Sequence, residues 1–210
     1  MQTASVKPLK PWFQTIEDVG APLNWYELFG NHNPVHLDIG CGRGLFLVNA
    51  SANQPEINYL GLEIDYCEGR RAATRLLKRN QSNARVLGGD CRIVLARLIT
   101  PGSVSASHVY FPDPWWKKRH HKRRLFTREF VDLLAYAVKP EGCVHSWSDV
   151  VEYFDVIRKL MDDHAAFSAA TPPPEREPQH DMDYQTSFER KKRQLGLPVY
   201  RGLWRRRGCR

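Results

Sequence analysis

The chain has 210 residues, of which 42% are hydrophobic and 11% aromatic, and its formal net charge is +8. This length suits one globular domain with a substantial core, and no apolar run is long enough to cross a membrane. Five cysteines, without a Cys-x-x-Cys pair, argue against a disulfide framework and a structural zinc site. The first 20 residues lack the apolar core of a secretory signal, so we expect a soluble, cytoplasmic protein.

The positive charge is concentrated in two blocks. Residues 117–128 hold seven Lys or Arg and no acid, and residues 190–210 hold nine more, again without an acid. Residues 152–183, which lie between them, hold eight acids and only three basic residues. A surface polarised in this way favours a polyanionic partner, of which nucleic acid is the commonest, although a membrane surface would also accept it.

From residue 35 onward, short apolar runs alternate with longer amphipathic runs, which is the pattern of consecutive βαβ units. We expect residues 1–34 to form an irregular or helical N-terminal extension and residues 35–210 to form a single domain. We predict strands over 35–40, 58–64, 84–89, 104–111, 142–148 and 198–205. We predict helices over 44–53, 66–80, 92–98, 127–138, 151–164 and 186–196, and a loop over 171–180. This order predicts an α/β fold with a mostly parallel central sheet, helices on both faces and ligands at the carboxyl ends of the strands.

A glycine-rich loop follows the first of these strands. Gly40, Gly42 and Gly44 stand at alternate positions, which lets the backbone turn tightly and approach a ligand closely. The spacing G-x-G-x-G differs from the G-x-G-x-x-G that seats the pyrophosphate of a dinucleotide. Asp38, just before the loop, would repel a pyrophosphate and suits a ligand that carries an amine.

Two further acids follow the next two strands. Glu63 ends the second strand, where a carboxylate can accept both hydroxyls of a ribose, and Asp90 ends the third, within reach of an adenine amino group. Each of them could instead be a turn residue or a helix cap. With Asp38 and the glycine loop, they resemble the S-adenosylmethionine-dependent methyltransferases of the Rossmann-like class I. That resemblance implies S-adenosylmethionine as cofactor, with Asp38 and the three glycines near its methionine moiety, Glu63 on its ribose, and Asp90 with Cys91 beside its adenine.

The segment after the fourth strand is the most informative one. In Phe111-Pro112-Asp113-Pro114-Trp115-Trp116, an acid stands between two prolines and beside two tryptophans that can hold a planar ring, and the first basic block follows directly. Together with Asp149 at the end of the fifth strand and Thr186-Ser187-Phe188-Glu189, this segment resembles the bacterial tRNA (guanine-N7-)-methyltransferase family. The resemblance covers roughly residues 35 to 205 and implies methyl transfer to N7 of the variable-loop guanine of tRNA.

The resemblance also implies a role for each matched residue. Guanine N7 has a lone pair and no proton to lose, so we expect Asp113 to orient the base and steady its developing charge rather than to abstract a proton. Asp113 is also expected to contact the cofactor. Asp149 and Glu189 would accept hydrogen bonds from the N1–H and amino edge of the guanine. The remaining expected substrate contacts, including those to tRNA phosphates, are Lys117, Arg119, His120, Lys122, Arg123, Arg124, Thr186, Ser187 and Phe188.

Simpler roles stay open for several of these residues. Asp113 could cap the helix expected near Thr127 or fix a turn, and one of the two tryptophans could be core packing. Thr186 could cap its helix with Glu189 completing a capping box, which would compete with guanine binding. His120-His121 has no third ligand at a sensible spacing, so no metal is expected.

Three rival functions are an exocyclic-amine nucleic-acid methyltransferase, a catalytically inactive RNA-binding relative and a small-molecule methyltransferase. The first uses Asp/Asn-Pro-Pro-aromatic, whereas only one proline follows Asp113. The second has no chemical need for acids at positions 38, 63 and 90, and the third leaves the basic blocks unexplained. We therefore expect tRNA as the partner, with no membrane, no metal and no required protein subunit.

Overall fold

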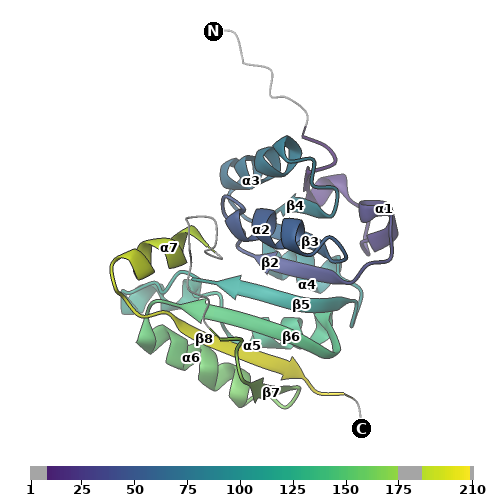
Figure 1. Cartoon of the computed structure of the whole chain (residues 1–210). Helices are drawn as coiled ribbons and strands as arrows, with labels where there is room; N and C mark the ends of the chain where they lie inside the picture. The colour runs from purple at the N-terminus through teal and green to yellow at the C-terminus, as the bar shows by residue number, and fades with distance from the viewer. Residues whose placement is uncertain (1–8, 175–185, 209–210) are drawn as a thin grey trace.

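The computed structural model describes residues 9–174 and 186–208, without the side chain of Ser187. Figure 1 shows one twisted sheet with helices on either side of it. The strands are β1 (Phe13–Thr15), β2 (Val35–Ile39), β3 (Asn58–Glu63), β4 (Ala84–Gly88), β5 (Val104–Tyr110), β6 (Val138–Ser148), β7 (Phe167–Ala170) and β8 (Tyr200–Arg206). The α-helices are α1 (Trp25–Phe29), α2 (Leu45–Asn53), α3 (Tyr66–Lys78), α4 (Cys91–Arg97), α5 (Arg128–Ala137), α6 (Val151–Asp162) and α7 (Ser187–Gln194). Two 3-10 helices are η1 (Ile16–Asp18) and η2 (Lys118–Arg123).

The eight described strands form one sheet in the order β1-β4-β3-β2-β5-β6-β8-β7. Neighbours from β1 to β6 run parallel, and only β8 pairs antiparallel, with β6 on one side and β7 on the other. The strand order reverses between β2 and β5, because β2 leads outward to β3 and β5 leads outward to β6. A crevice opens at the carboxyl ends of such a pair, and ligands bind there in open α/β sheets. The predicted mostly parallel α/β fold is confirmed.

Successive side chains of a strand point to opposite faces of the sheet, so the strands contribute to two hydrophobic cores. Leu37, Leu60 and Leu62 join the larger core with residues of α4, α5 and α6, whereas Tyr59 and Val86 join a smaller core with α2 and α3. These two groups of helices cover opposite faces, as Figure 1 shows. Asp38 lies on the α2 side of β2, and this side leads to the glycine loop.

The N-terminal segment differs from the irregular or helical extension expected for it. Phe13–Thr15 forms edge strand β1, which pairs parallel with β4, and Trp25–Phe29 forms the short helix α1. The ring nitrogen of Trp12 donates to the carbonyl of Gln81 at 2.9 Å, which fixes this segment to the end of α3. No helix within the described residues is long and apolar enough to cross a membrane.

Candidate active site

The glycine loop leads from β2 into α2, and its geometry leaves open space beside a buried carboxylate. Gly40, Gly42 and Gly44 have φ values of +79°, +50° and +72°, a region that favours glycine. A Cβ on Gly40 or Gly42 would meet no atom within 4 Å. Asp38 is 3% exposed, and its Oδ2 has no hydrogen-bond partner among the described residues. Burial, with a smaller contribution from the charge of Glu63, raises the pKa of Asp38 to about 8. This carboxyl therefore suits a ligand that brings a donor or a positive charge.

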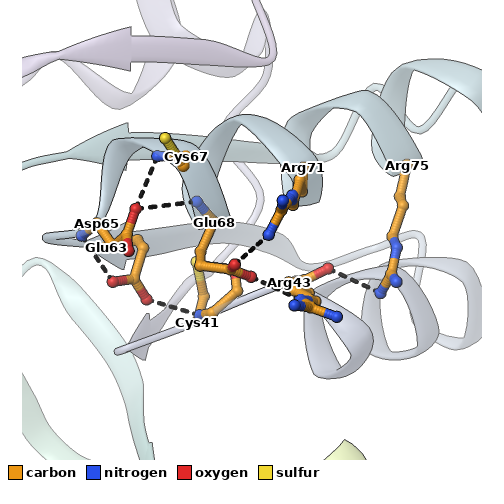
Figure 2. Close-up of polar contacts among 9 residues, drawn as sticks. Cys41, Arg43, Glu63, Asp65, Cys67, Glu68, Arg71 and Arg75 are labelled. Atoms are coloured by element: carbon orange, nitrogen blue, oxygen red, sulfur yellow. Dashed lines mark hydrogen bonds and ion pairs between the residues drawn. The ribbon is translucent and has the colours of Figure 1, made fainter.

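Glu63, at the end of β3, holds the glycine loop from the neighbouring strand (Figure 2). Its Oε2 accepts a hydrogen bond from the backbone N–H of Gly42 at 2.7 Å, and its Oε1 accepts one from the N–H of Asp65 at 2.9 Å. Asp65 in turn caps α3 by accepting from the N–H groups of Cys67 and Glu68. The carboxylate expected to take a ribose thus also shapes the loop that it faces.

A second set of contacts fixes the same loop from α3, as Figure 2 shows. The carboxylate of Glu68 accepts from Nε of Arg43 at 2.7 Å and also pairs with Arg71. Arg75 donates to the carbonyl of Arg43 at 2.9 Å. Sequence reasoning missed these residues, because only the Glu68–Arg71 spacing within one helix is visible before the fold is known.

The third acid, Asp90, caps α4, since its Oδ1 accepts from the N–H of Arg92 at 2.8 Å. The helix-cap role considered for it is therefore present, and its second oxygen is the one left for a ligand. Burial, together with the charge of Asp90, raises the pKa of Cys91 to about 12, which keeps the thiol neutral. Ile16 packs so closely on Gly89 that a Cβ there would lie 2.2 Å from its Cδ1. Beside them, Ile64 is 70% exposed, so apolar side chains border this end of the site.

The loop after β5 presents Asp113 at a hollow of about 440 Å³, whose lining is Asp113, Pro114, Trp115, Trp116, Lys117 and His120. Phe111 and Trp115 have φ values of +52° and +44°, so two non-glycine residues on either side of Asp113 adopt the left-handed region. Such strain costs about 1–3 kcal/mol per residue and clusters at functional sites. The helix-cap role considered for Asp113 is wrong, because Thr127 itself caps α5 by accepting from the N–H of Phe130 at 3.3 Å.

The two tryptophans of this loop have different environments. The guanidinium of Arg123 lies over the ring of Trp115 at 5.1 Å, and His120 meets the same ring edge-on at 5.9 Å. Trp116 is 71% exposed. Both tryptophans line the hollow, but the ring of Trp115 has partners, whereas the ring of Trp116 is mostly exposed.

Most of the basic segment points to solvent, and one member does not. Lys117, Arg119 and Arg123 are exposed, whereas Arg124 is half-buried. Its Nε donates to the carbonyl of Pro114 at 2.7 Å, and its guanidinium lies over the ring of Tyr153 at 4.7 Å. Arg124 therefore anchors the Asp113 loop to α6, in contrast to the phosphate role expected for it.

Helix α7 brings the C-terminal motif to the Asp113 loop. The ring of Phe188 stacks on that of Phe111 with centroids 6.0 Å apart, and Nζ of Lys192 pairs with Oδ2 of Asp149 at 2.7 Å. Thr186 caps the helix by accepting from the N–H of Glu189 at 3.0 Å. The predicted substrate residues 149, 186, 188 and 189 therefore lie together beside Phe111, and the side chain of Ser187 lies outside the described part.

Glu189 is 5% exposed, and its Oε1 accepts from Arg193 at 3.3 Å. Burial raises the pKa of Tyr110, and the charges of Asp38 and Glu189 raise it further. Tyr110 ends β5 directly before Phe111, which stacks on Phe188 of α7. Sequence reasoning missed Tyr110 and Lys192, since nothing in the sequence says that α7 folds back over β5.

Within residues 9–174 and 186–208, no group of three or more His, Cys, Asp or Glu side chains could hold a metal ion. The arrangement instead offers two adjoining compartments at the β2/β5 crevice. One is the glycine loop with Asp38, Glu63 and Asp90, and the other is the Asp113 hollow with Asp149 and α7.

Comparison with known proteins agrees with this arrangement. Residues 32–202 match the model of a family described as "Putative methyltransferase". The chain is 40% identical over 205 residues to a tRNA (guanine-N(7)-)-methyltransferase of Rhodopirellula baltica, covering 95% of the chain and 76% of that protein. It is 35% identical over 202 residues to the enzyme of the same name from Thermosynechococcus vestitus, covering 96% and 92%. Because these matches leave out few residues, they extend into residues 1–34, where no motif was visible.

Solved structures of low sequence identity share the fold alone. The 16S rRNA methyltransferase KamB aligns with a TM-score of 0.63 at 17% identity, over 88% of this chain and 93% of that one. The aminoglycoside resistance methyltransferase NpmB1 aligns with a TM-score of 0.57 at 14% identity, over 86% and 92%. With the sequence relatives above, the chain belongs to the tRNA (guanine-N7-)-methyltransferase family of class I methyltransferases.

Proposed function

We propose that this protein uses S-adenosylmethionine to methylate N7 of a guanine in tRNA, in the variable loop as the family resemblance implies. The observation that carries the proposal is the pair of compartments at the β2/β5 crevice. The buried carboxyl of Asp38 lies near the end of β2, and the Asp113 hollow follows β5, which pairs parallel with β2. Methyl transfer requires donor and acceptor in line, and adjoining compartments suit that geometry.

The residues of the glycine-loop compartment fit S-adenosylmethionine. The unpartnered Oδ2 of Asp38 can accept from the α-amino group, and the open space over Gly40 and Gly42 admits the methionine chain. Glu63 and Asp90 would take the ribose hydroxyls and the adenine amino group, and the exposed Ile64 would pack on the adenine ring. When bound, the cofactor supplies an electrophilic methyl group on a sulfonium.

On the acceptor side, the chain has to position a base rather than to move a proton. Transfer of the methyl group to the N7 lone pair would move the positive charge from the cofactor to the guanine ring. The carboxylate of Asp113 would stabilise that charge there. The two strained residues that flank Asp113 fix this carboxylate before the base arrives, so little reorganisation is needed.

Asp149 and Glu189 would bind the N1–H and amino edge of the guanine. Each already accepts from a cation of α7, Lys192 and Arg193 respectively. A carboxylate has about four lone-pair positions, so the ion pair of Asp149 with Lys192 leaves others for the base.

The exposed cations of the loop and of η2 would bind phosphates around the target base. Lys117, Arg119 and Arg123 lie next to the hollow, with His120 at its wall. Phosphate contacts position the RNA, and the base itself supplies selection. We expect the logarithm of the tRNA binding constant to fall with the logarithm of salt by about 0.7–0.9 per phosphate contacted.

A methyl-transfer assay on unmodified tRNA, followed by nucleoside analysis, tests the proposal. We expect 7-methylguanosine as the product, and calorimetry with S-adenosylmethionine should show stoichiometric binding. Binding of the cofactor without any methylated nucleoside would point to an inactive RNA-binding relative. Methyl groups on the exocyclic amines of adenine or cytosine would point to an amino-methyltransferase instead.

A further inference from the structure

Trp116 is a large apolar side chain that the fold leaves on the surface at the rim of the Asp113 hollow. It is 71% exposed, and no ring or cation stacks on it within residues 9–174 and 186–208. Burying a large apolar side chain stabilises a fold, and Trp116 forgoes most of that stabilisation. Its neighbour Trp115 has both an edge-on partner and a cation over its ring, so the two indoles are not equivalent.

The residues around Trp116 indicate which kind of partner would bind to its exposed ring. Lys117, Lys118 and Arg119 follow it directly and are exposed, while Asp113 faces the same hollow. Single-stranded nucleic acid binds to surfaces where aromatic side chains stack on bases and neighbouring cations follow the backbone. A protein partner would be expected to need a wider apolar area, whereas a single base fits one exposed indole.

We propose that Trp116 is the stacking platform for an unpaired nucleobase of the RNA next to the methylated guanine. This inference rests on the proposed function, and it adds a second base-binding position at the edge of the Asp113 hollow, which Trp116 helps to line. Stacking on Trp116 would keep the RNA strand open after the target guanine has left the stack of neighbouring bases. Lys117 and Arg119 would bind the adjoining phosphates. Trp115, whose ring is already occupied by Arg123, serves the pocket wall instead.

Binding of a fluorescent tRNA transcript to the full chain at several salt concentrations tests this position. We expect Trp116→Ala to weaken binding about tenfold or more, with the slope against salt unchanged, because stacking releases no counterions. Trp116→Phe should retain most of the affinity. Arg119→Ala should instead reduce the slope by about 0.7–0.9. Tyr136→Ala, which removes an exposed aromatic residue on α5 away from the hollow, is the control and should bind as the wild type does.

Transcripts that lack one base next to the target guanine identify the stacked nucleotide. One of them should bind the wild type as weakly as the intact tRNA binds Trp116→Ala, and combining the two changes should cost nothing further. The inference is overturned if Trp116→Ala binds like the wild type, if its salt slope changes, or if every base removal adds to the substitution. If the wild type makes no 7-methylguanosine, the proposed function fails instead, so the two failures are distinguishable.

Discussion

At the scale of single residues, two carboxyl groups of the site differ in their exposure to solvent. Asp38 is buried beside the charge of Glu63, which raises its pKa to about 8, whereas Asp113 is exposed at an open hollow. The first can bind a cation only by giving up its proton, and the second is available to a base as it arrives. We therefore propose that Asp38 binds the cofactor and that Asp113 acts on the acceptor base.

This assignment predicts opposite defects for two conservative substitutions. We expect Asp113→Asn to lower kcat by about 100-fold with cofactor affinity nearly unchanged, because an amide cannot stabilise the charge that develops on the guanine. Asp38→Asn should weaken S-adenosylmethionine binding, because an amide carries no negative charge to form an ion pair with the α-amino group. Single-turnover kinetics and calorimetry separate the two effects. Full turnover by Asp113→Asn would refute the role given to that residue.

At the scale of elements, β2, β5 and β6 carry a group of histidines on the face that leads to the site, of which His108 is buried and His36 and His145 are half-buried. His108 bonds through Nε2 to Nδ1 of His36 at 3.2 Å and through Nδ1 to the hydroxyl of Tyr110 at 2.9 Å. Its ring stacks on that of His145, with centroids 4.8 Å apart. Burial lowers the pKa of His36 and of His145 to about 4, and it lowers the pKa of His108 well below 6.5.

These shifts predict an acid-labile fold. Because the folded-state pKa values are depressed, the unfolded chain binds up to three more protons here as the pH falls from 6.5 toward 4. The stabilisation that the three neutral histidines contribute is complete above pH 6.5 and is lost as the pH falls from 6.5 toward 4. Asp38 has the opposite effect, because its raised pKa lets the folded state bind one proton more than the unfolded chain in this pH range. We therefore expect the free energy of unfolding to fall with decreasing pH, with a net slope of up to about two protons.

Denaturant unfolding at a series of pH values measures that slope. His145→Gln removes one of the three groups and should reduce the slope by about one proton, whatever its effect on absolute stability. Tyr136→Ala, which is remote from the histidines, should leave the slope unchanged. A free energy that stays flat or rises between pH 6.5 and 4.5 would contradict the account.

Between elements, α7 depends on contacts that no local pattern records. Its Phe188 meets Phe111 after β5, and its Lys192 meets Asp149 after β6. The motif that contains Phe188 was visible in the sequence, and the periodicity predicted a helix there. The docking was not predictable, because it joins segments separated by some 40 to 80 residues.

At the scale of the whole molecule, the positions of the parallel strands β2 to β6 along the chain could be predicted from their apolar residues, although β6 begins at Val138 rather than at residue 142. The edge strands β1 and β7 escaped prediction because they are only three and four residues long. The basic run shows a second limit. Charge alone could not say that Arg124 turns inward onto Pro114 and Tyr153 while Arg123 stays outside. That difference arises from the 3-10 turn of η2 and the packing of α6.

The proposed function of the whole molecule depends on a single acceptor atom, which is N7 of the target guanine. A tRNA transcript in which the target guanine is replaced by 7-deazaguanine tests this claim most directly, since it removes N7 and leaves the Watson–Crick edge intact. We predict that this transcript binds with nearly unchanged affinity and accepts no methyl group, whereas the guanine transcript is converted to 7-methylguanosine. Methyl incorporation into the 7-deazaguanine transcript would contradict the account.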